Sequence, residues 1–173
     1  GFVFTQEVPN NEELSLAYSK NYYNGDIYKN YLENAMHRRI SYFFSLNQFR
    51  NSTGILSGKI LEIGCATGDF LDVAKFLGYD TSGIEISEWA ASISKGKGHN
   101  IINADVTQFF NNETLYPMFD AIFLWDVFEH LAYPNIVLAN ISKTLNAGGA
   151  VVINTLNIDS PTVKYLNDKW SNY

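Results

Sequence analysis

The sequence predicts an α/β fold, in which a doubly wound, mostly parallel sheet follows an N-terminal helical cap. From residue 59 onward, short apolar runs alternate with stretches of helical periodicity, which is the pattern of β–α–β units. The runs are almost continuously apolar, as expected for strands buried on both faces of a parallel sheet. The length of 173 residues and the hydrophobic content of 46% are typical of a chain with one full core. We therefore expect a helical cap over residues 1–54 and one α/β domain over residues 55–173.

The cap is predicted to contain two helices. Apolar side chains recur at three- and four-residue intervals over residues 28–46, which is the spacing of an amphipathic helix, and residues 51–54 carry the signal that ends it. A shorter helix is expected over residues 12–19. We expect the long helix to cover the sheet edge, with Tyr22 or Tyr23 acting as a lid over a ligand. The aromatic residues of the long helix that we expect in the core are Tyr28, Tyr31, Phe43 and Phe44.

Five strands and three crossover helices are expected in the α/β domain. Pro134 near the start of one helix and Gly148-Gly149 after its end fit the usual asymmetry of helix start and stop. A further helix can begin at Thr162, but no strand is expected after it. The expected strands are residues 59–63, 81–86, 100–104, 120–125 and 150–155, and the helices are residues 69–77, 88–97 and 135–145.

The composition excludes several classes of protein. A formal charge of −6 and an isoelectric point near 4.9, without a stripe of Lys and Arg, argue against binding to long nucleic acid. The only cysteine, Cys65, cannot form an intramolecular disulfide, so a reducing, cytoplasmic compartment is expected. The longest strictly apolar run covers only residues 121–125, far below the roughly 18–20 residues that span a bilayer. We therefore expect no membrane, nucleic-acid or metal partner, and a small molecule or another protein instead.

A glycine turn after the first predicted strand is the most informative stretch. Gly64 and Gly68 allow the backbone to bend and to approach a ligand without interference from a Cβ atom. The dinucleotide fingerprint G-x-G-x-x-G would require glycine at Ala66 and Asp69, and both are absent. Glu62 before the turn and Asp69 after it would repel a pyrophosphate and attract a cation, which points to a sulfonium.

Acidic residues stand at the ends of four successive predicted strands: Glu62, Glu85, Asp105 and Asp126. Glu85 can accept hydrogen bonds from both hydroxyls of a ribose, and no Lys or Arg follows it closely to hold a 2′-phosphate, which disfavours NADP. Asp105 and Val106 can supply a carboxylate and an apolar wall to an adenine. Asp126 either contacts the ligand or caps the turn that follows. Core packing alone does not explain four such carboxylates.

These motifs resemble those of the class I S-adenosylmethionine-dependent methyltransferases, over about residues 59–157. Residues 62–68 are similar to the first motif of that family, with Ala66 in place of its central glycine. Residues 125–131 resemble the ubiquinone-methyltransferase-like branch, and weaker features resemble bacterial enzymes that tailor sugars, glycans or small metabolites. The resemblance implies a Rossmann-like sheet with the strand order 3-2-1-4-5-7-6. Since little sequence follows the fifth strand, strands six and seven are expected to be missing and the domain to be C-terminally truncated.

The resemblance implies S-adenosyl-L-methionine as cofactor and S-adenosyl-L-homocysteine as product. An in-line methyl transfer to a small-molecule or sugar acceptor depends mainly on alignment and exclusion of water. His130 is a candidate general base for a hydroxyl acceptor, or alternatively only a hydrogen-bonding partner of the backbone; His37 and His99 are expected on the surface. The expected cofactor-binding residues are Glu62, Gly64, Cys65, Ala66, Gly68, Glu85, Ile86, Asp105, Val106, Trp125 and Asp126.

Alternatives remain open at this point. Glu62 either contacts the ligand directly or accepts hydrogen bonds from the backbone amides of the turn. Cys65 is expected to contribute its backbone rather than its thiol. The chain could also be a non-catalytic module that holds S-adenosylmethionine, or, less favoured, an NAD-dependent oxidoreductase.

Overall fold

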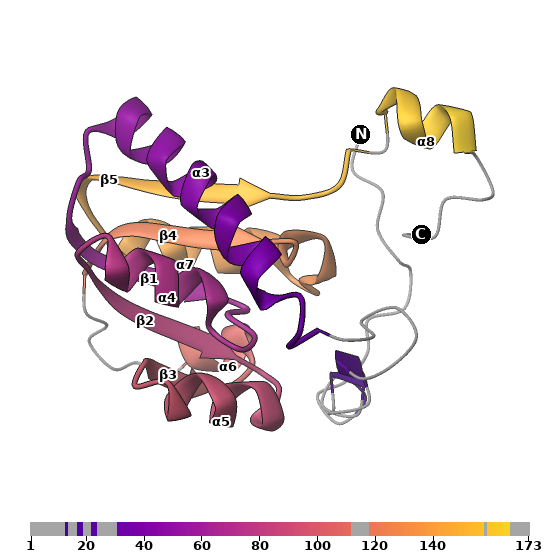
Figure 1. Ribbon diagram of the computed structural model, residues 1–173. Helices are drawn as coiled ribbons and strands as arrows, with labels where there is room; N and C mark the ends of the chain where they lie inside the picture. Colours follow the sequence, from indigo (N-terminus) through magenta and orange to yellow (C-terminus); the bar gives the residue numbers. More distant parts are fainter. Residues whose placement is uncertain are drawn as a thin grey trace.

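The computed structural model describes residues 13, 17–18, 22–23, 31–111, 118–157 and 159–166. Within this part of the chain, five strands form one sheet in the order β3-β2-β1-β4-β5, and every neighbouring pair is parallel (Figure 1). The predicted doubly wound parallel sheet is thereby confirmed. From β1 to β3 successive strands are added toward one edge of the sheet, whereas β4 and β5 are added on the other side of β1. In sheets of this kind, ligands bind beyond the carboxyl ends of the strands at the position between β1 and β4 where the order reverses. The strands are β1 (Gly58–Ile63), β2 (Tyr79–Glu85), β3 (Asn100–Asn103), β4 (Phe119–Trp125) and β5 (Leu145–Asn154).

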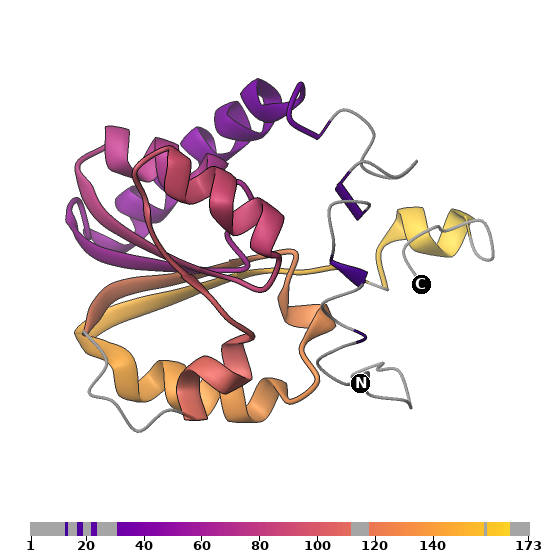
Figure 2. The same ribbon diagram turned by 90° about the horizontal axis from the view of Figure 1, so that it is seen from below.

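Helices cover both faces of the sheet. The helices α3, α4 and α5 lie on one face, and α6 and α7 lie on the other (Figure 2). No helix in the described ranges is long and apolar enough to cross a membrane. The helices are α3 (Ala35–Thr53), α4 (Asp69–Phe76), α5 (Glu88–Gly96), α6 (Val106–Asn111), α7 (Pro134–Thr144) and α8 (Pro161–Leu166), and a 3-10 turn, η1 (Phe128–His130), follows β4.

The strands divide their side chains between two apolar cores, one on each face of the sheet. In β4, Phe123 packs toward α3 and α4, whereas its neighbour Ile122 packs toward α6 and α7. In β1, Ile60 belongs to the same core as Phe123. Glu62 comes two residues after Ile60 and therefore lies on the same face. This alternation places a carboxylate beside an aromatic core, at the carboxyl end of the central strand.

The predicted long helix is confirmed as α3, although it begins only at Ala35, after a turn over residues 31–34. Gly54 follows its last residue with a φ of 76°, and the Gly54 N–H donates a hydrogen bond to the carbonyl of Arg50 at 2.9 Å. Glycine adopts this left-handed conformation at little cost. The predicted stop at residues 51–54 is therefore confirmed. Most of the helix predicted over residues 12–19 lies outside the described residues, and so does Tyr28.

The core face of α3 differs from the prediction. Phe43 and Phe44 are 39% and 68% exposed, so the expectation that they make core contacts was wrong. Tyr42, Leu46 and Phe49 occupy the core instead, and their spacing of four and three residues places them on one stripe of the helix. A helix of this packing buries only one such stripe, and Phe43 and Phe44 lie beside it.

We expect Leu46→Ala to lower the free energy of unfolding by about 2–5 kcal/mol, because Leu46 is completely buried and its loss leaves a cavity. The matched control is Phe44→Ala on the same helix, which should change the free energy by no more than about 0.5 kcal/mol. Urea denaturation followed by circular dichroism measures both. Equal losses in the two variants would contradict this assignment of the core face.

Two other elements differ from the prediction. The strand expected over residues 150–155 begins already at Leu145, directly after α7. Asp120 of β4 helps to explain this, because its Oδ1 accepts a hydrogen bond from Asn146 at 2.8 Å and its Oδ2 accepts one from the Lys59 N–H at 2.7 Å. The carboxylate thus ties both neighbouring strands to the start of β4. Helix α6 was not predicted, since six residues are too few to show helical periodicity.

Candidate cofactor-binding site

A cavity of about 660 Å³ lies beyond the carboxyl ends of β1 to β4. Its size is within the range of pockets that hold small molecules. The structure brings together there all but one of the residues that the sequence predicted; the exception, Gly68, does not line the cavity. The predicted residues that line it are Glu62, Gly64, Cys65, Ala66, Glu85, Ile86, Asp105, Val106, Trp125, Asp126 and His130.

The glycine turn joins β1 to α4 and forms one wall of the cavity. Gly64 has a φ of 72°, and a Cβ atom there would collide with Cγ2 of Val127. Gly68 also has a positive φ, of 78°, but a Cβ atom there would meet Ser94 and His99. Gly64 therefore lets the backbone border the cavity, whereas Gly68 allows α4 to pack closely against α5 and the loop after it. Ala66 adopts a φ of 45° without being a glycine, so the turn retains its shape there.

Glu85 ties the two βα turns together. Its Oε2 accepts a hydrogen bond from the Ala66 N–H at 2.7 Å, and its Oε1 accepts one from the Ser87 N–H at 2.8 Å. Burial raises the pKa of this carboxyl, and the hydrogen bonds from Ser87 and Ala66 oppose that rise. Hydrogen bonds from the Ile86 N–H and the Tyr23 side chain also oppose the rise, so the protein itself supplies donors to this carboxylate at the cavity wall.

Glu62 is buried in the cavity wall with one oxygen unsatisfied. The side chain is 3% exposed, and Oε2 has no hydrogen-bond partner among the described residues. The backbone amides of the turn therefore do not donate a hydrogen bond to Oε2 of Glu62, which was one of the two alternatives left open by the sequence. Burial raises the pKa of Glu62 well above its usual value, and the charges of Glu85, Asp69 and Asp72 raise it further. A buried acceptor without a donor is costly, and a cationic ligand would supply that donor.

The other two strand-end carboxylates are partly engaged by the protein. Asp105 Oδ1 accepts hydrogen bonds from the N–H groups of Thr107 and Gln108, at 2.9 and 3.1 Å, at the start of α6. Asp126 adopts a φ of 53°, and its N–H donates to the Asn154 carbonyl at 3.0 Å. Burial raises the pKa of Asp126, and Glu129 adds to that rise. All four predicted acidic residues border the one cavity.

The histidines differ in their surroundings. His130 lines the cavity from η1, where its backbone N–H donates to the Val127 carbonyl at 2.9 Å. His99 is buried, with 7% exposure, so its expected place on the surface was wrong. Its Nε2 lies 2.7 Å from Oδ1 of Asp72, a partner on α4 that local sequence does not reveal.

Sequence reasoning missed Arg38, which lines the cavity from α3. Its guanidinium lies 3.6 Å above the centre of the Tyr31 ring, and its Nε and Nη2 donate to Oδ2 of Asp69 at 3.0 and 2.5 Å. Asp69 is therefore not free to attract a cation, contrary to the expectation from sequence. A signal was present, because Arg38 stands four residues before Tyr42 and so shares the core-facing stripe of α3.

Tyrosines and a tryptophan supply the aromatic wall of the cavity. Tyr22 and Tyr23, which the sequence suggested as a lid, both line it. Tyr23 is 5% exposed, and burial raises its pKa, as does the charge of Glu85. Trp125 stacks on Phe123 with ring centres 5.9 Å apart, and its buried indole N–H has no partner among the described residues. The lid function of the tyrosines remains a prediction.

Comparison with known proteins agrees with this geometry. A family model described as a methyltransferase domain matches residues 28–172. The chain is similar to a ubiquinone biosynthesis O-methyltransferase of Nitrosococcus oceani, with 28% identity over 116 residues, which are 65% of this chain and 49% of the relative. It is similar to the protein of the same name in Pseudomonas fluorescens, with 22% identity over 65% of this chain and 50% of the relative. The chain thus spans about half the length of the curated relatives that it matches.

Solved structures show the same fold. The plantazolicin methyltransferase BpumL, in complex with S-adenosylhomocysteine, superposes with a TM-score of 0.66 and 22% identity, over 87% of this chain and 62% of that one. CalS10, an amino pentose methyltransferase of Micromonospora echinaspora, superposes with a TM-score of 0.60 and 18% identity, over 73% and 56% of the two chains. Because the family model covers most of the sequence and the sheet has the same architecture, this chain belongs to the class I S-adenosylmethionine-dependent methyltransferases.

Proposed function

We propose that this chain binds S-adenosylmethionine in the described cavity and that the protein transfers the methyl group to a small-molecule or sugar acceptor. The observation that carries the proposal is the convergence of the glycine turn and four strand-end carboxylates on one cavity of about 660 Å³. A cofactor with a sulfonium and an ammonium suits an acidic cavity, whereas a pyrophosphate does not.

The residues present fit the cofactor. The unsatisfied Oε2 of Glu62 is a site for its ammonium group, and Glu85, which lines the cavity at the end of β2, would accept hydrogen bonds from the ribose hydroxyls. Asp105 and Val106 border the part of the cavity that would take the adenine. Arg38 is a cation in an otherwise acidic wall and would hold the carboxylate of the methionine end.

S-adenosylmethionine would supply an activated methyl group, so the protein has little covalent chemistry to perform. The aromatic wall would exclude water and hold the acceptor in line with the methyl group. For a hydroxyl acceptor, His130 at the cavity edge would accept the proton. The relatives named as O-methyltransferases and the amino pentose methyltransferase among the structures support a small acceptor as a class.

Isothermal titration calorimetry tests the proposal. We expect S-adenosylmethionine and S-adenosylhomocysteine to bind with dissociation constants of about 1 μM, which corresponds to roughly −8 kcal/mol. NAD should not bind, because the turn lacks the dinucleotide glycines. Absence of binding by both sulfur compounds would overturn the proposal. Binding without methyl transfer to any of a panel of hydroxyl and amine acceptors would favour the alternative, a module that only holds the cofactor.

A further inference from the structure

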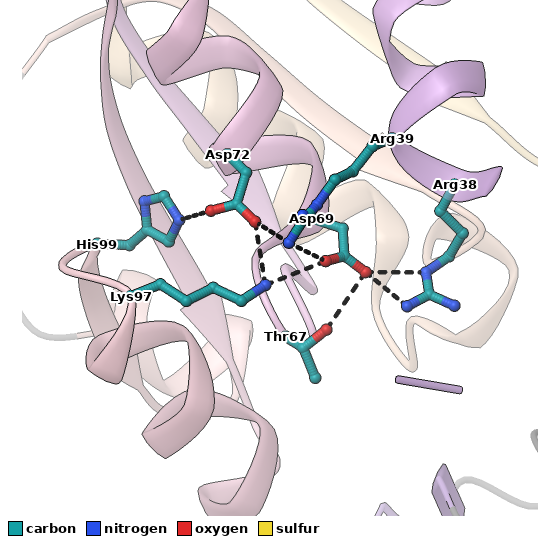
Figure 3. Close-up of polar contacts among 7 residues, drawn as sticks. All are labelled: Arg38, Arg39, Thr67, Asp69, Asp72, Lys97 and His99. Atoms are coloured by element: carbon teal, nitrogen blue, oxygen red, sulfur yellow. Dashed lines mark hydrogen bonds and ion pairs between the residues drawn. The ribbon is translucent and has the colours of Figure 1, made fainter. Parts of the chain in front are cut away.

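A cluster of polar and charged side chains reaches the wall of the cavity, which its members Arg38 and Asp69 line, and joins three parts of the fold. We name it the Asp69 cluster; it connects α3, the start of α4, and the segment between α5 and β3 (Figure 3). Asp69 stands at its centre and is only 4% exposed. Members of the cluster are Arg38, Arg39, Thr67, Asp69, Asp72, Lys97 and His99.

The two carboxylates of the cluster share Arg39 and Lys97 as partners, but only Asp69 contacts Arg38. Asp69 accepts hydrogen bonds from Nε and Nη2 of Arg38, at 3.0 and 2.5 Å, from Lys97 at 3.0 Å and from Arg39 at 3.3 Å. Asp72 contacts Arg39, Lys97 and His99, at 2.5, 3.1 and 2.7 Å, but not Arg38. Asp69 is thus the acid of the cluster that fixes the cavity-lining arginine, and Asp72 offers a natural comparison.

The guanidinium of Arg38 is held on two sides in the ligand-free chain. Asp69 binds one edge of its guanidinium, and the ring of Tyr31 lies 3.6 Å beneath its central carbon. Nη1 has no hydrogen-bond partner in the part of the chain that the structure describes, so N–H donors remain at the cavity wall. An arginine side chain loses much rotamer freedom when it binds a ligand, and prior fixation removes that cost.

The charges of the cluster leave Arg38 able to attract an anion. Two carboxylates, Asp69 and Asp72, face three cations, Arg38, Arg39 and Lys97. Burial raises the pKa of Asp69, but hydrogen bonds from Arg38 and Lys97 outweigh this and lower it overall. Asp69 therefore stays ionised. Because Lys97 also pairs with Asp69, the negative charge of Asp69 does not fully neutralise the positive charge of Arg38.

We propose that Asp69 is a positioning residue, which holds the Arg38 guanidinium at the cavity wall so that its free N–H donors meet the carboxylate at the amino-acid end of the cofactor. This inference rests on the proposed function. Asp69 also lines the cavity, but its oxygens are bonded to Arg38, Arg39 and Lys97, so it acts through Arg38 rather than through a contact of its own with the cofactor. Replacing Asp69 should therefore lower the affinity only for those ligands that carry the carboxylate.

Two ligands separate this positioning from a general structural role. S-adenosylhomocysteine carries the carboxylate, whereas 5′-methylthioadenosine has the same nucleoside and thioether without the amino-acid end. In calorimetry, we expect Asp69→Asn to weaken binding of S-adenosylhomocysteine about tenfold and that of methylthioadenosine less than about twofold. The matched control Asp72→Asn removes a charge from the same helix but no contact to Arg38, and should leave both affinities within about twofold.

A double variant tests whether the two residues act as one unit. We expect Arg38→Met to weaken binding of S-adenosylhomocysteine more than Asp69→Asn does, and Arg38→Met/Asp69→Asn to bind no more weakly than Arg38→Met alone. Urea denaturation checks that each variant is folded. Equal weakening of both ligands by Asp69→Asn, or additive losses in the double variant, would overturn this inference alone. A wild-type chain that binds neither ligand would overturn the proposed function and this inference with it.

Discussion

We expect Glu85→Ala to weaken binding of S-adenosylhomocysteine by more than about a hundredfold. Hydrogen bonds from the two ribose hydroxyls to a carboxylate contribute roughly 1.5–3 kcal/mol each, and the substitution removes both. It also removes the acceptor for the N–H groups of Ala66 and Ser87, which lie 2.7 and 2.8 Å from the Glu85 oxygens. The variant therefore loses both a ligand contact and the hydrogen bonds that shape the glycine turn.

Calorimetry with S-adenosylhomocysteine measures this loss, and two further variants show its origin. Asp80→Ala removes an exposed acid from the same strand and should leave the affinity unchanged. Glu85→Gln keeps one acceptor oxygen and should give an intermediate affinity. Urea denaturation separates folding from binding, because each buried donor left unsatisfied in Glu85→Ala costs about 1–3 kcal/mol of stability. A folded Glu85→Ala variant with wild-type affinity would exclude Glu85 from the ribose site.

The sheet and most of the candidate site could be predicted because their signals are local. A buried parallel strand is a short apolar run, and the turn after β1 carries its two glycines and its two flanking acids within eight residues, 62–69. Parallel strands bring their carboxyl ends to one edge, so the amino-acid sequence is enough to place Glu85 and Asp105 beside that turn. The cavity lining confirms that these residues lie together.

Features that depend on pairing between distant segments could not be predicted. Arg38 and Asp69 are 31 residues apart, and although helical spacing places Arg38 on the core-facing stripe of α3, nothing in the local sequence shows that the two residues pair. The burial of His99 depends in the same way on Asp72, which stands 27 residues earlier on another element. On α3, apolar residues lie on more than one side of the helix, so periodicity alone does not identify Phe49 rather than Phe44 as the core residue.

We expect Glu62→Gln to make the ligand-free chain more stable than the wild type at neutral pH. In the folded chain, burial and then the charges of Glu85, Asp69 and Asp72 raise the pKa of Glu62 well above 4.5, while Lys97 opposes the rise. As the pH rises above about 4.5, the unfolded wild-type chain therefore loses this proton before the folded chain does, and its free energy of unfolding falls. Glutamine carries no titrating proton, so the variant should escape this decline. Urea denaturation at several pH values measures the difference.

The same carboxyl should couple cofactor binding to proton release. An ammonium group pairs with the ionised form of Glu62, so binding lowers the pKa of Glu62 that burial had raised. The affinity for the cofactor therefore increases as the pH rises through the pKa that Glu62 has in the ligand-free chain. Calorimetry between pH 5 and 8, in buffers of different ionisation enthalpy, counts the protons released. Because the pKa values of Glu85 and Asp126 are raised as well, the Glu62 contribution is the difference between the wild type and Glu62→Gln.

At pH 8 we expect Glu62→Gln to bind S-adenosylhomocysteine about tenfold or more weakly, since it loses a charged hydrogen bond. At pH 5 the two proteins should differ little, because the wild-type carboxyl then holds its proton and resembles the amide. The gain in stability and the loss in affinity of Glu62→Gln have one cause: ionisation of the buried Glu62 carboxyl is costly unless a cationic group of the ligand is bound beside it. Equal proton release and equal pH dependence in the two proteins would show that the ammonium group pairs elsewhere.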